Sequence, residues 1–111
     1  MIKYKKISGG IFGEQVRKLS GGKTTYKDIS QSIEKQIGIP VVRSLSVLSA
    51  FSEIVTEELQ EGKSVYIEGI GVLSVGIGLE NGKVTARKLT IIPSTEMRKR
   101  LQDIRIEEVT K

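Results

Sequence analysis

The 111-residue sequence contains neither cysteine nor histidine. Without cysteine the chain forms no disulfide and offers no thiolate nucleophile or thiolate metal ligand. Without histidine it holds no His-dependent catalytic triad. The lack of cysteine also fits a reducing compartment. These absences remove common routes to nucleophilic and metal chemistry, and they favour a protein that is not an enzyme.

Aromatic residues are scarce, at 5% of the chain, so the core must be built from aliphatic side chains. The hydrophobic content of 38% suits one small globular domain rather than a disordered chain. A domain of this size has a modest core, which a partner subunit would extend. No apolar run approaches the length of a membrane span, and the N-terminus lacks the apolar core of a signal peptide. We therefore expect a soluble, cytoplasmic protein without a membrane partner.

Acidic residues are fewer than basic ones, 13 against 18, and the resulting formal net charge of +5 is unevenly distributed along the chain. Residues 1–24 carry six basic groups and one acidic group (+5), and residues 25–62 carry three and six (−3). Residues 63–92 carry four and two (+2), and residues 93–111 carry five and four (+1). The strand-rich regions are thus basic and the central helical region is acidic, which suits a polyanion bound on one face. Ordinary solubility charge is the competing interpretation, and charge alone does not separate the two.

The first helix has clear start and stop signals. Thr25 is a good N-cap, and Asp28 falls at the third helical position, near the positive end of the helix. Ile29, Ile33 and Ile37 recur every four residues and form one apolar stripe. Gly38 follows and is expected to end the helix.

The second helix is expected to run from Pro40, in its first turn, to about Glu61. Its apolar residues cover an arc of roughly 220° at ~100° per residue, whereas one packing partner needs only about 100° or a little more. The part of the apolar arc that one partner would leave uncovered predicts a second packing partner, and another copy of the chain is the economical candidate. A wholly intrachain core is the alternative. The expected dimer interface consists of Leu45, Leu48, Phe51, Ile54 and Val55.

The remaining pattern is mainly one of strands. Strands are expected over residues 2–7, 14–19, 64–68, 72–77, 84–92 and 105–109. The first two are predicted to form a hairpin. Asn81-Gly82 is a strong tight-hairpin signal, because both residues tolerate positive φ. Pro93 ends a strand, and Ser94 or Thr95 is expected to cap a third, short helix.

Two segments echo catalytic motifs without completing them. Gly21-Gly22-Lys23-Thr24 resembles the end of a phosphate-binding loop, but Arg17 stands where that motif needs its first glycine. Acid pairs such as Glu57/Glu58 are adjacent in sequence, so on a helix they do not share a face. No general-base or metal-ligand constellation is present in the sequence. We therefore expect no catalytic residue, no metal and no cofactor.

The segment from Glu57 to Val75 carries a resemblance to a known family. It resembles the HU/IHF family of histone-like DNA-binding proteins in the order of its parts. These parts are a helix end at Gly62-Lys63, a short strand with Val65 and Ile67, the Gly69-Ile70-Gly71 turn and a second strand. Pro93 and the helix after it resemble that family's proline and final helix. The similarity spans about Thr25 to Ile104, and the extra terminal strands resemble an atypical HU-like branch.

The resemblance implies an α+β fold of the IHF-like DNA-binding type. In it, a helical dimerisation body joins a small antiparallel sheet with a β-arm and a C-terminal helix. On this interpretation residues 1–111 form a single HU-like domain with four segments. They are an N-terminal β-hairpin (1–24), a helix–helix body (25–62), a sheet and short arm (63–93), and a C-terminal helix and strand (94–111).

The arm departs from the family's usual form. Only Gly78 to Lys83 separates its expected strands, and its tip has no proline to wedge into DNA. Gly76 and Gly78 stand where the family tends to carry arginines. For Leu79, a core contact near the turn is favoured over a role as a smaller wedge.

The function implied is non-enzymatic binding of double-stranded DNA by a homodimer, or a heterodimer with a paralogue, in the nucleoid. Contacts to phosphates, low sequence specificity and a steep salt dependence are expected. The alternative is a protein-interaction or structural module on the same dimer scaffold with weak or lost DNA binding. The expected DNA-binding residues are Lys63, Lys83, Arg87, Lys88, Thr95, Arg98 and Lys99.

Overall fold

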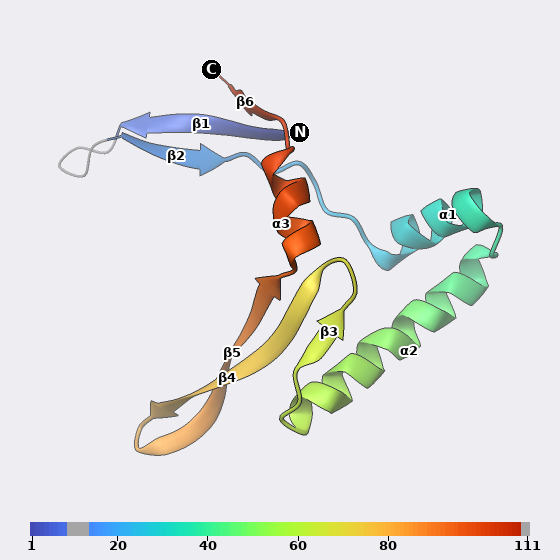
Figure 1. The fold of residues 1–111 in the computed structure, drawn as a ribbon, viewed down its shortest axis with the longest axis vertical. Coiled ribbons are helices and arrows are strands. Elements are labelled where there is room, and N and C mark those ends of the chain that lie inside the picture. The colour runs from blue at the N-terminus through green and yellow to red at the C-terminus, as the bar shows by residue number, and fades with distance from the viewer. Residues whose placement is uncertain (9–13, 110–111) are drawn as a thin grey trace. The chain divides into compact units, whose positions relative to one another are not determined.

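The computed structural model describes residues 1–8 and 14–109, which form a mixed α+β structure (Figure 1). By packing, the chain divides into two compact units, one of residues 1–23 with 99–111 and one of residues 24–98. The helices are α1 (Tyr26–Ile37), α2 (Val41–Gln60) and α3 (Thr95–Gln102). The strands are β1 (Ile2–Ser8), β2 (Glu14–Lys18), β3 (Val65–Ile67), β4 (Gly71–Glu80), β5 (Lys83–Pro93) and β6 (Ile106–Glu108).

Helix α1 begins and ends where its sequence signals predict. Thr25 has extended backbone angles, and its hydroxyl accepts from the Asp28 amide while the Asp28 carboxylate accepts from the Thr25 amide, a reciprocal capping box. At the other end Gly38 adopts the left-handed conformation (φ 77°), and its amide bonds to the Glu34 carbonyl. Residues close in sequence therefore supply hydrogen bonds to backbone groups at both ends of α1.

Helix α2 begins one residue later than expected. Pro40 is its N-cap rather than part of its first turn, and its extended backbone leads into Val41. The amides of Glu61 and Gly62 close the last turn on the Glu57 and Leu59 carbonyls. The chain then leaves the helix through Gly62 in the left-handed conformation (φ 85°).

The buried side chains of α1 and α2 are small and polar. Figure 1 shows α1 folded back along the N-terminal half of α2. Ser30 on α1 and Ser44 on α2 are the buried residues of these helices, at 0% and 3% exposure. Among the described residues, no hydrophobic side chain of this chain is buried. Within the described part of one chain, the aliphatic core expected from the composition therefore stays partly exposed.

The sheet β3-β4-β5 is antiparallel throughout and carries the arm. β4 and β5 pair from Gly71 opposite Pro93 to Glu80 opposite Lys83. Asn81 (φ 51°) and Gly82 (φ 77°) form the turn, both with positive φ as predicted. The strands reach further toward this turn than residues 72–77 and 84–92, because cross-strand hydrogen bonding continues to the two-residue loop.

Gly71 is required where β4 starts beside the end of β5. A Cβ at this position would collide with the carbonyl oxygen of Ile92 and approach Cα of Pro93. The same turn is tied to the next helix, since the Ser94 amide donates to the Ile70 carbonyl at 2.9 Å. The Gly69–Gly71 segment therefore holds the start of β4, the end of β5 and the start of α3 close together.

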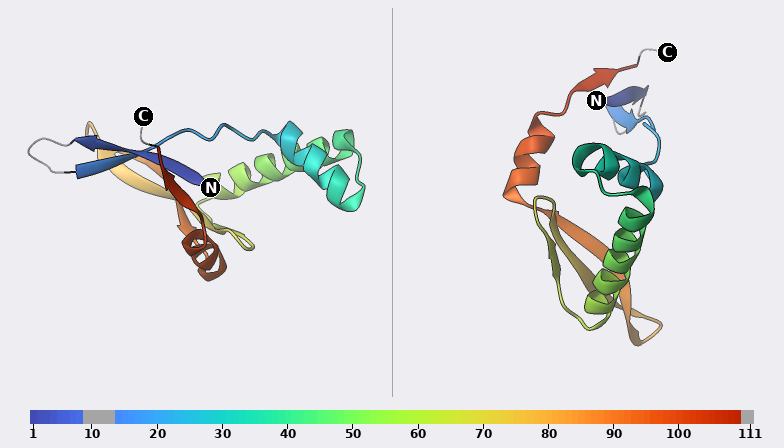
Figure 2. Two further views of the ribbon diagram at one scale, coloured as in Figure 1. Left: turned by 90° about the horizontal axis from the view of Figure 1, so that it is seen from above. Right: turned by 90° about the vertical axis from the view of Figure 1, so that its right-hand side faces the viewer.

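The terminal strands form a second sheet in the order β2-β1-β6. β1 and β2 are the expected antiparallel hairpin, with Tyr4 opposite Lys18 and Ser8 opposite Glu14. β6 pairs with β1 in parallel, with Ile2 beside Ile106, and Figure 2 shows the two strands side by side. The sequence predicted the strand at residues 105–109 but not its partner.

The capping box makes the stability of α1 depend on pH. Hydrogen bonds from the Thr25 amide and hydroxyl, each 2.9 Å long, lower the pKa of the Asp28 carboxyl. A lowered pKa in the folded state stabilises the protein at pH values above the ordinary carboxyl pKa of about 3.9. This stabilisation is lost as the pH falls through the lowered pKa of the folded state. We expect the free energy of unfolding to fall more steeply below about pH 4 in the wild type than in Asp28→Asn, by urea titration. Identical pH slopes in the two proteins would contradict this account.

Candidate nucleic-acid interface

The register of β4 and β5 separates the arm into two chemically different faces. One face carries four apolar cross-strand pairs, namely Leu73/Ile91, Val75/Leu89, Ile77/Ala86 and Leu79/Val84. The other face begins with the apolar pair Val72/Ile92 at the base of the arm and then carries small, polar and basic pairs, namely Ser74/Thr90, Gly76/Lys88, Gly78/Thr85 and Glu80/Lys83. We call the second face the basic arm face. It places Lys83 and Lys88, both exposed, on one side of the hairpin.

A β-bulge between Gly76 and Ile77 adds Arg87 to the basic arm face. Lys88 pairs with Gly76 and Ala86 pairs with Ile77, so Arg87 is the extra, unpaired residue. Its side chain lies across Gly78, where a Cβ would stand 2.5 Å from Arg87 Cδ, and its Nη1 donates to the Leu79 carbonyl at 3.4 Å. The absence of a side chain at Gly78 therefore leaves space for the Arg87 side chain of the opposite strand.

Two of the predicted basic residues have acidic neighbours. Lys63 Nζ lies 3.2 Å from Glu58 Oε2 and 3.7 Å from Glu61 Oε2, so it closes the end of α2 as an ion pair. Lys83 stands opposite Glu80 at the arm tip. Both side chains remain exposed, and a phosphate would compete with these carboxylates for them. Arg87 and Lys88 have no such neighbour across the strand.

The remaining predicted residues lie on α3. Ser94 is the cap, because its hydroxyl accepts from the Met97 amide at 3.1 Å, and Thr95 is the first helical residue. Arg98 and Lys99 follow and are exposed. The structure thus groups the predicted residues into the basic arm face and the exposed surface of α3, with Lys63 apart at the end of α2.

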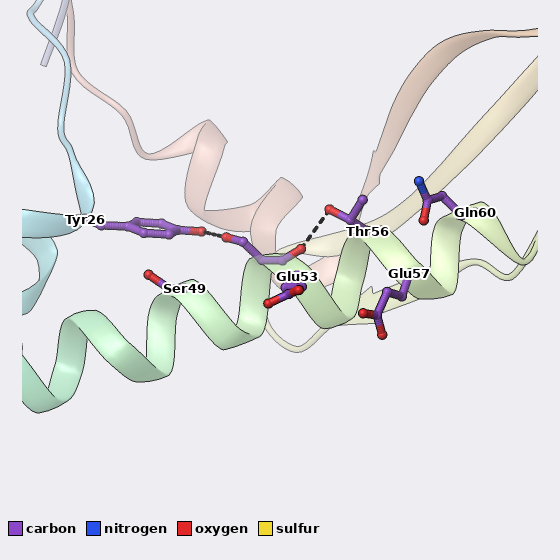
Figure 3. A pocket seen from close by; sticks show the side chains of 7 residues that line it. Tyr26, Ser49, Glu53, Thr56, Glu57 and Gln60 are labelled. Atoms are coloured by element: carbon purple, nitrogen blue, oxygen red, sulfur yellow. Dashed lines mark hydrogen bonds between the residues drawn. The ribbon is translucent and has the colours of Figure 1, made fainter.

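A hollow of about 600 Å³ lies along α2, but its chemistry is wrong for a polyanion. Figure 3 shows the Tyr26 side chain beside α2, and its hydroxyl shares a hydrogen bond with the Ser52 hydroxyl. The other lining residues are polar or acidic, and they include Glu53 and Glu57. Carboxylates repel phosphate, so this hollow lies outside the candidate interface.

The described residues contain no group of three or more acidic side chains positioned to hold a metal ion. None of the helices in the described part of the chain is long and apolar enough to cross a membrane.

Sequence reasoning missed two features of the arm. The expectation that Leu79 makes a core contact is wrong, because this side chain is 68% exposed at the arm tip. The alternation of Leu73, Val75, Ile77 and Leu79 was a visible signal of one apolar face. The bulge at Arg87 had no comparable signal, because it depends on how the two strands pair.

Comparisons with known proteins agree with this fold. The crystal structure of a candidate bacterial DNA-binding protein from Bacteroides vulgatus ATCC 8482 superposes with a TM-score of 0.75 at 13% identity, over 97% of this chain. This chain spans 48% of that protein's chain. The Anabaena HU–DNA cocrystal structure superposes with a TM-score of 0.50 at 14% identity, over 73% of this chain and all of the HU chain.

Curated protein sequences yielded no match. Residues 14–108 match the family described as "HU domain fused to wHTH, Ig, or Glycine-rich motif", which covers most of the chain. Together with the α+β architecture, the Gly69–Gly71 turn and the β4–β5 arm, this match identifies the chain as a member of that HU-like family.

Proposed function

We propose that this chain binds double-stranded DNA through phosphate contacts, as a dimer and with little sequence preference. The observation that carries the proposal is the division of the arm into an apolar face and a basic arm face with Lys83, Arg87 and Lys88. The second cluster is Thr95, Arg98 and Lys99 on α3. The nearby N-terminus of this eight-residue helix adds backbone N–H groups that favour an anion.

Phosphate contact rather than base readout follows from the residue types. Base-specific binding relies on Asn, Gln or Arg side chains directed at base edges from an element that fits a groove. The arm presents glycines and short side chains between its cations. Backbone contacts position a protein on DNA without reading its sequence, so we expect low specificity and a steep dependence on salt.

Dimer formation is supported by the exposed apolar surface of the chain. Its accessible surface is 9543 Å², whereas compact folding of the two units separately would leave roughly 7,000 Å². Phe51 and Ile54, from the expected interface, are 45% and 57% exposed. An apolar hollow of about 580 Å³ between α2 and the arm, lined by Leu59, Val75 and Leu89 among others, is a further surface for a second copy.

The apolar arm face favours one alternative function. Ile77, Leu79 and Val84 are 74%, 68% and 66% exposed, which is unusual for a solvated hairpin. A protein-interaction module on an HU-like scaffold would use this face to bind another protein and would bind DNA weakly. In either case the chain acts by binding, as an architectural protein rather than an enzyme.

The DNA proposal is tested by charge reversal on the basic arm face. We expect the wild type to bind a 30-base-pair duplex, in fluorescence anisotropy titrations at 50 to 200 mM salt, with an affinity that falls steeply as salt rises. Arg87→Glu/Lys88→Glu should weaken binding by roughly 100-fold and reduce the salt slope by about 2. Light scattering on the wild type should give the mass of a homodimer.

A matched control is Lys27→Glu/Arg43→Glu, which makes the same change in charge on α1 and α2. Both positions lie in the first turn of a helix, where an acidic residue is favourable, so folding should be preserved. Its salt slope should stay close to that of the wild type. If the wild type fails to bind the duplex even at 50 mM salt, the DNA proposal is refuted and the protein-interaction module is favoured.

A further inference from the structure

The terminal sheet β2-β1-β6 also has two unlike faces, and its register identifies them. Ile2, Tyr4, Val16 and Ile106 lie on one face, where they line a hollow together with Lys6 and Lys18. Successive residues of a strand alternate between faces, so Lys3, Lys5 and Arg17 lie on the opposite one. We call this opposite side the basic terminal face.

The three cations of the basic terminal face are crowded together. Lys5 and Arg17 are direct cross-strand partners, which places their Cβ atoms about 5 Å apart. Lys3 lies two residues along the same strand, about 7 Å from Lys5. The only acidic residue that the register places on this face is Glu107, beside Lys3. Within the described residues, no ion pair engages Lys3, Lys5 or Arg17.

This arrangement destabilises the free sheet. Like charges directly opposite each other on neighbouring strands repel, and an acid at either position would replace repulsion with attraction. All three side chains are exposed, so a ligand can reach them. A polyanion would convert the repulsion into binding, because its phosphates lie between the cations and release counterions when neutralised.

We propose that the basic terminal face is a second phosphate-binding surface, at which Lys3, Lys5 and Arg17 contact the backbone of duplex DNA. This inference rests on the proposed function, since it adds contacts outside the arm and α3 to DNA binding by the same chain. The charge complementarity singles out DNA backbone rather than an apolar partner, which would favour the opposite face with Ile2 and Ile106. The surface contributes affinity without sequence preference.

The experiment compares two double variants that remove equal charge from the same two strands. Lys5→Gln/Arg17→Gln neutralises the cross-strand pair of the basic terminal face. Lys6→Gln/Lys18→Gln neutralises two lysines on the opposite face and is the matched control. Both are titrated by anisotropy against a 30-base-pair duplex from 50 to 200 mM salt, and both are melted in a thermal scan.

We expect Lys5→Gln/Arg17→Gln to reduce the salt slope by about 1.8, or 0.9 for each lost phosphate contact, and to bind roughly 10-fold or more weakly at 100 mM salt. Its melting temperature should equal or exceed that of the wild type, because the substitution removes repulsion. The control should keep the wild-type salt slope. Weaker binding with an intact melting temperature therefore cannot come from misfolding.

Two results would overturn the inference, and they differ from failure of the proposed function. If Lys5→Gln/Arg17→Gln loses no more affinity and no more salt slope than Lys6→Gln/Lys18→Gln while the wild type binds, the basic terminal face does not contact DNA. If only Lys6→Gln/Lys18→Gln weakens binding, the opposite face is the contact. Failure of the wild type to bind any duplex would refute the proposed function itself, and the inference with it.

Discussion

The double variant Phe51→Asp/Ile54→Asp is expected to lose both the dimer and the folded state at micromolar concentration. Both side chains are substantially exposed in one chain, and no hydrophobic side chain among the described residues is buried. If α2 of a second copy covers them, each aspartate places an unpaired charge in an apolar interface, at a cost of about 3–5 kcal/mol. Two such costs approach the whole stability of a small domain, which is about 5–15 kcal/mol.

Light scattering and thermal unfolding at several protein concentrations measure this outcome. In a dimer that folds as it assembles, the melting temperature of the wild type rises with concentration. The control is Val42→Asp, the same kind of substitution on the same helix. Val42 is 77% exposed and lies in the first turn of α2, where an acidic residue is favourable. If Phe51→Asp/Ile54→Asp matches the wild type in mass and melting temperature, α2 is not the dimer interface.

The substitution Gly71→Ala is expected to destabilise the sheet by about 3 kcal/mol and to lower the melting temperature by roughly 10 °C or more. The added methyl group would collide with the backbone of Ile92 and Pro93 rather than with a side chain that can rotate away. Relief requires β4 to separate from β5, which would also disturb the hydrogen bond between the Ser94 amide and the Ile70 carbonyl. The arm and the start of α3 would lose their common anchor.

Gly76→Ala, five residues along the same strand, is the control for this prediction. A Cβ there would lie 3.8 Å from the Lys88 carbonyl oxygen, an ordinary contact. Alanine in a strand interior loses less backbone freedom on folding than glycine, so stability should be unchanged or slightly higher. Urea denaturation of the three proteins measures the difference. Equal stability of Gly71→Ala and Gly76→Ala would show that the close approach at Ile92 carries no cost.

Local signals in the sequence predicted the helices and turns well. Thr25, Asp28 and Gly38 define α1 because capping groups act on backbone atoms within three or four residues. Asn81-Gly82 defines the arm tip for the same reason, since positive φ at two adjacent positions is a property of those residues themselves. The helical body and the HU-like resemblance follow from such short-range patterns.

The parallel pairing of β6 with β1 was not predictable from local pattern, unlike the two hairpins. β6 joins β1 in parallel across about one hundred residues of sequence, and three residues on each strand carry too little pattern to select that partner. The same limit applies to the bulge at Arg87, which exists only relative to the register of β4. The prediction of a core contact for Leu79 was wrong because apolar character does not show which face of a hairpin is covered.

The sequence by itself determined the helical elements, the turn types, the basic character of the strand-rich segments and the absence of cysteine and histidine chemistry. Each of these depends on residue identity and on neighbours a few positions away. Only the tertiary structure decided which cations share a face, because register sets the side of a sheet on which a side chain lies. It placed Arg87 over Gly78, Lys5 opposite Arg17, and Gly71 against Ile92. Each of these contacts depends on the register of two paired strands, which the identity of residues a few positions away does not fix.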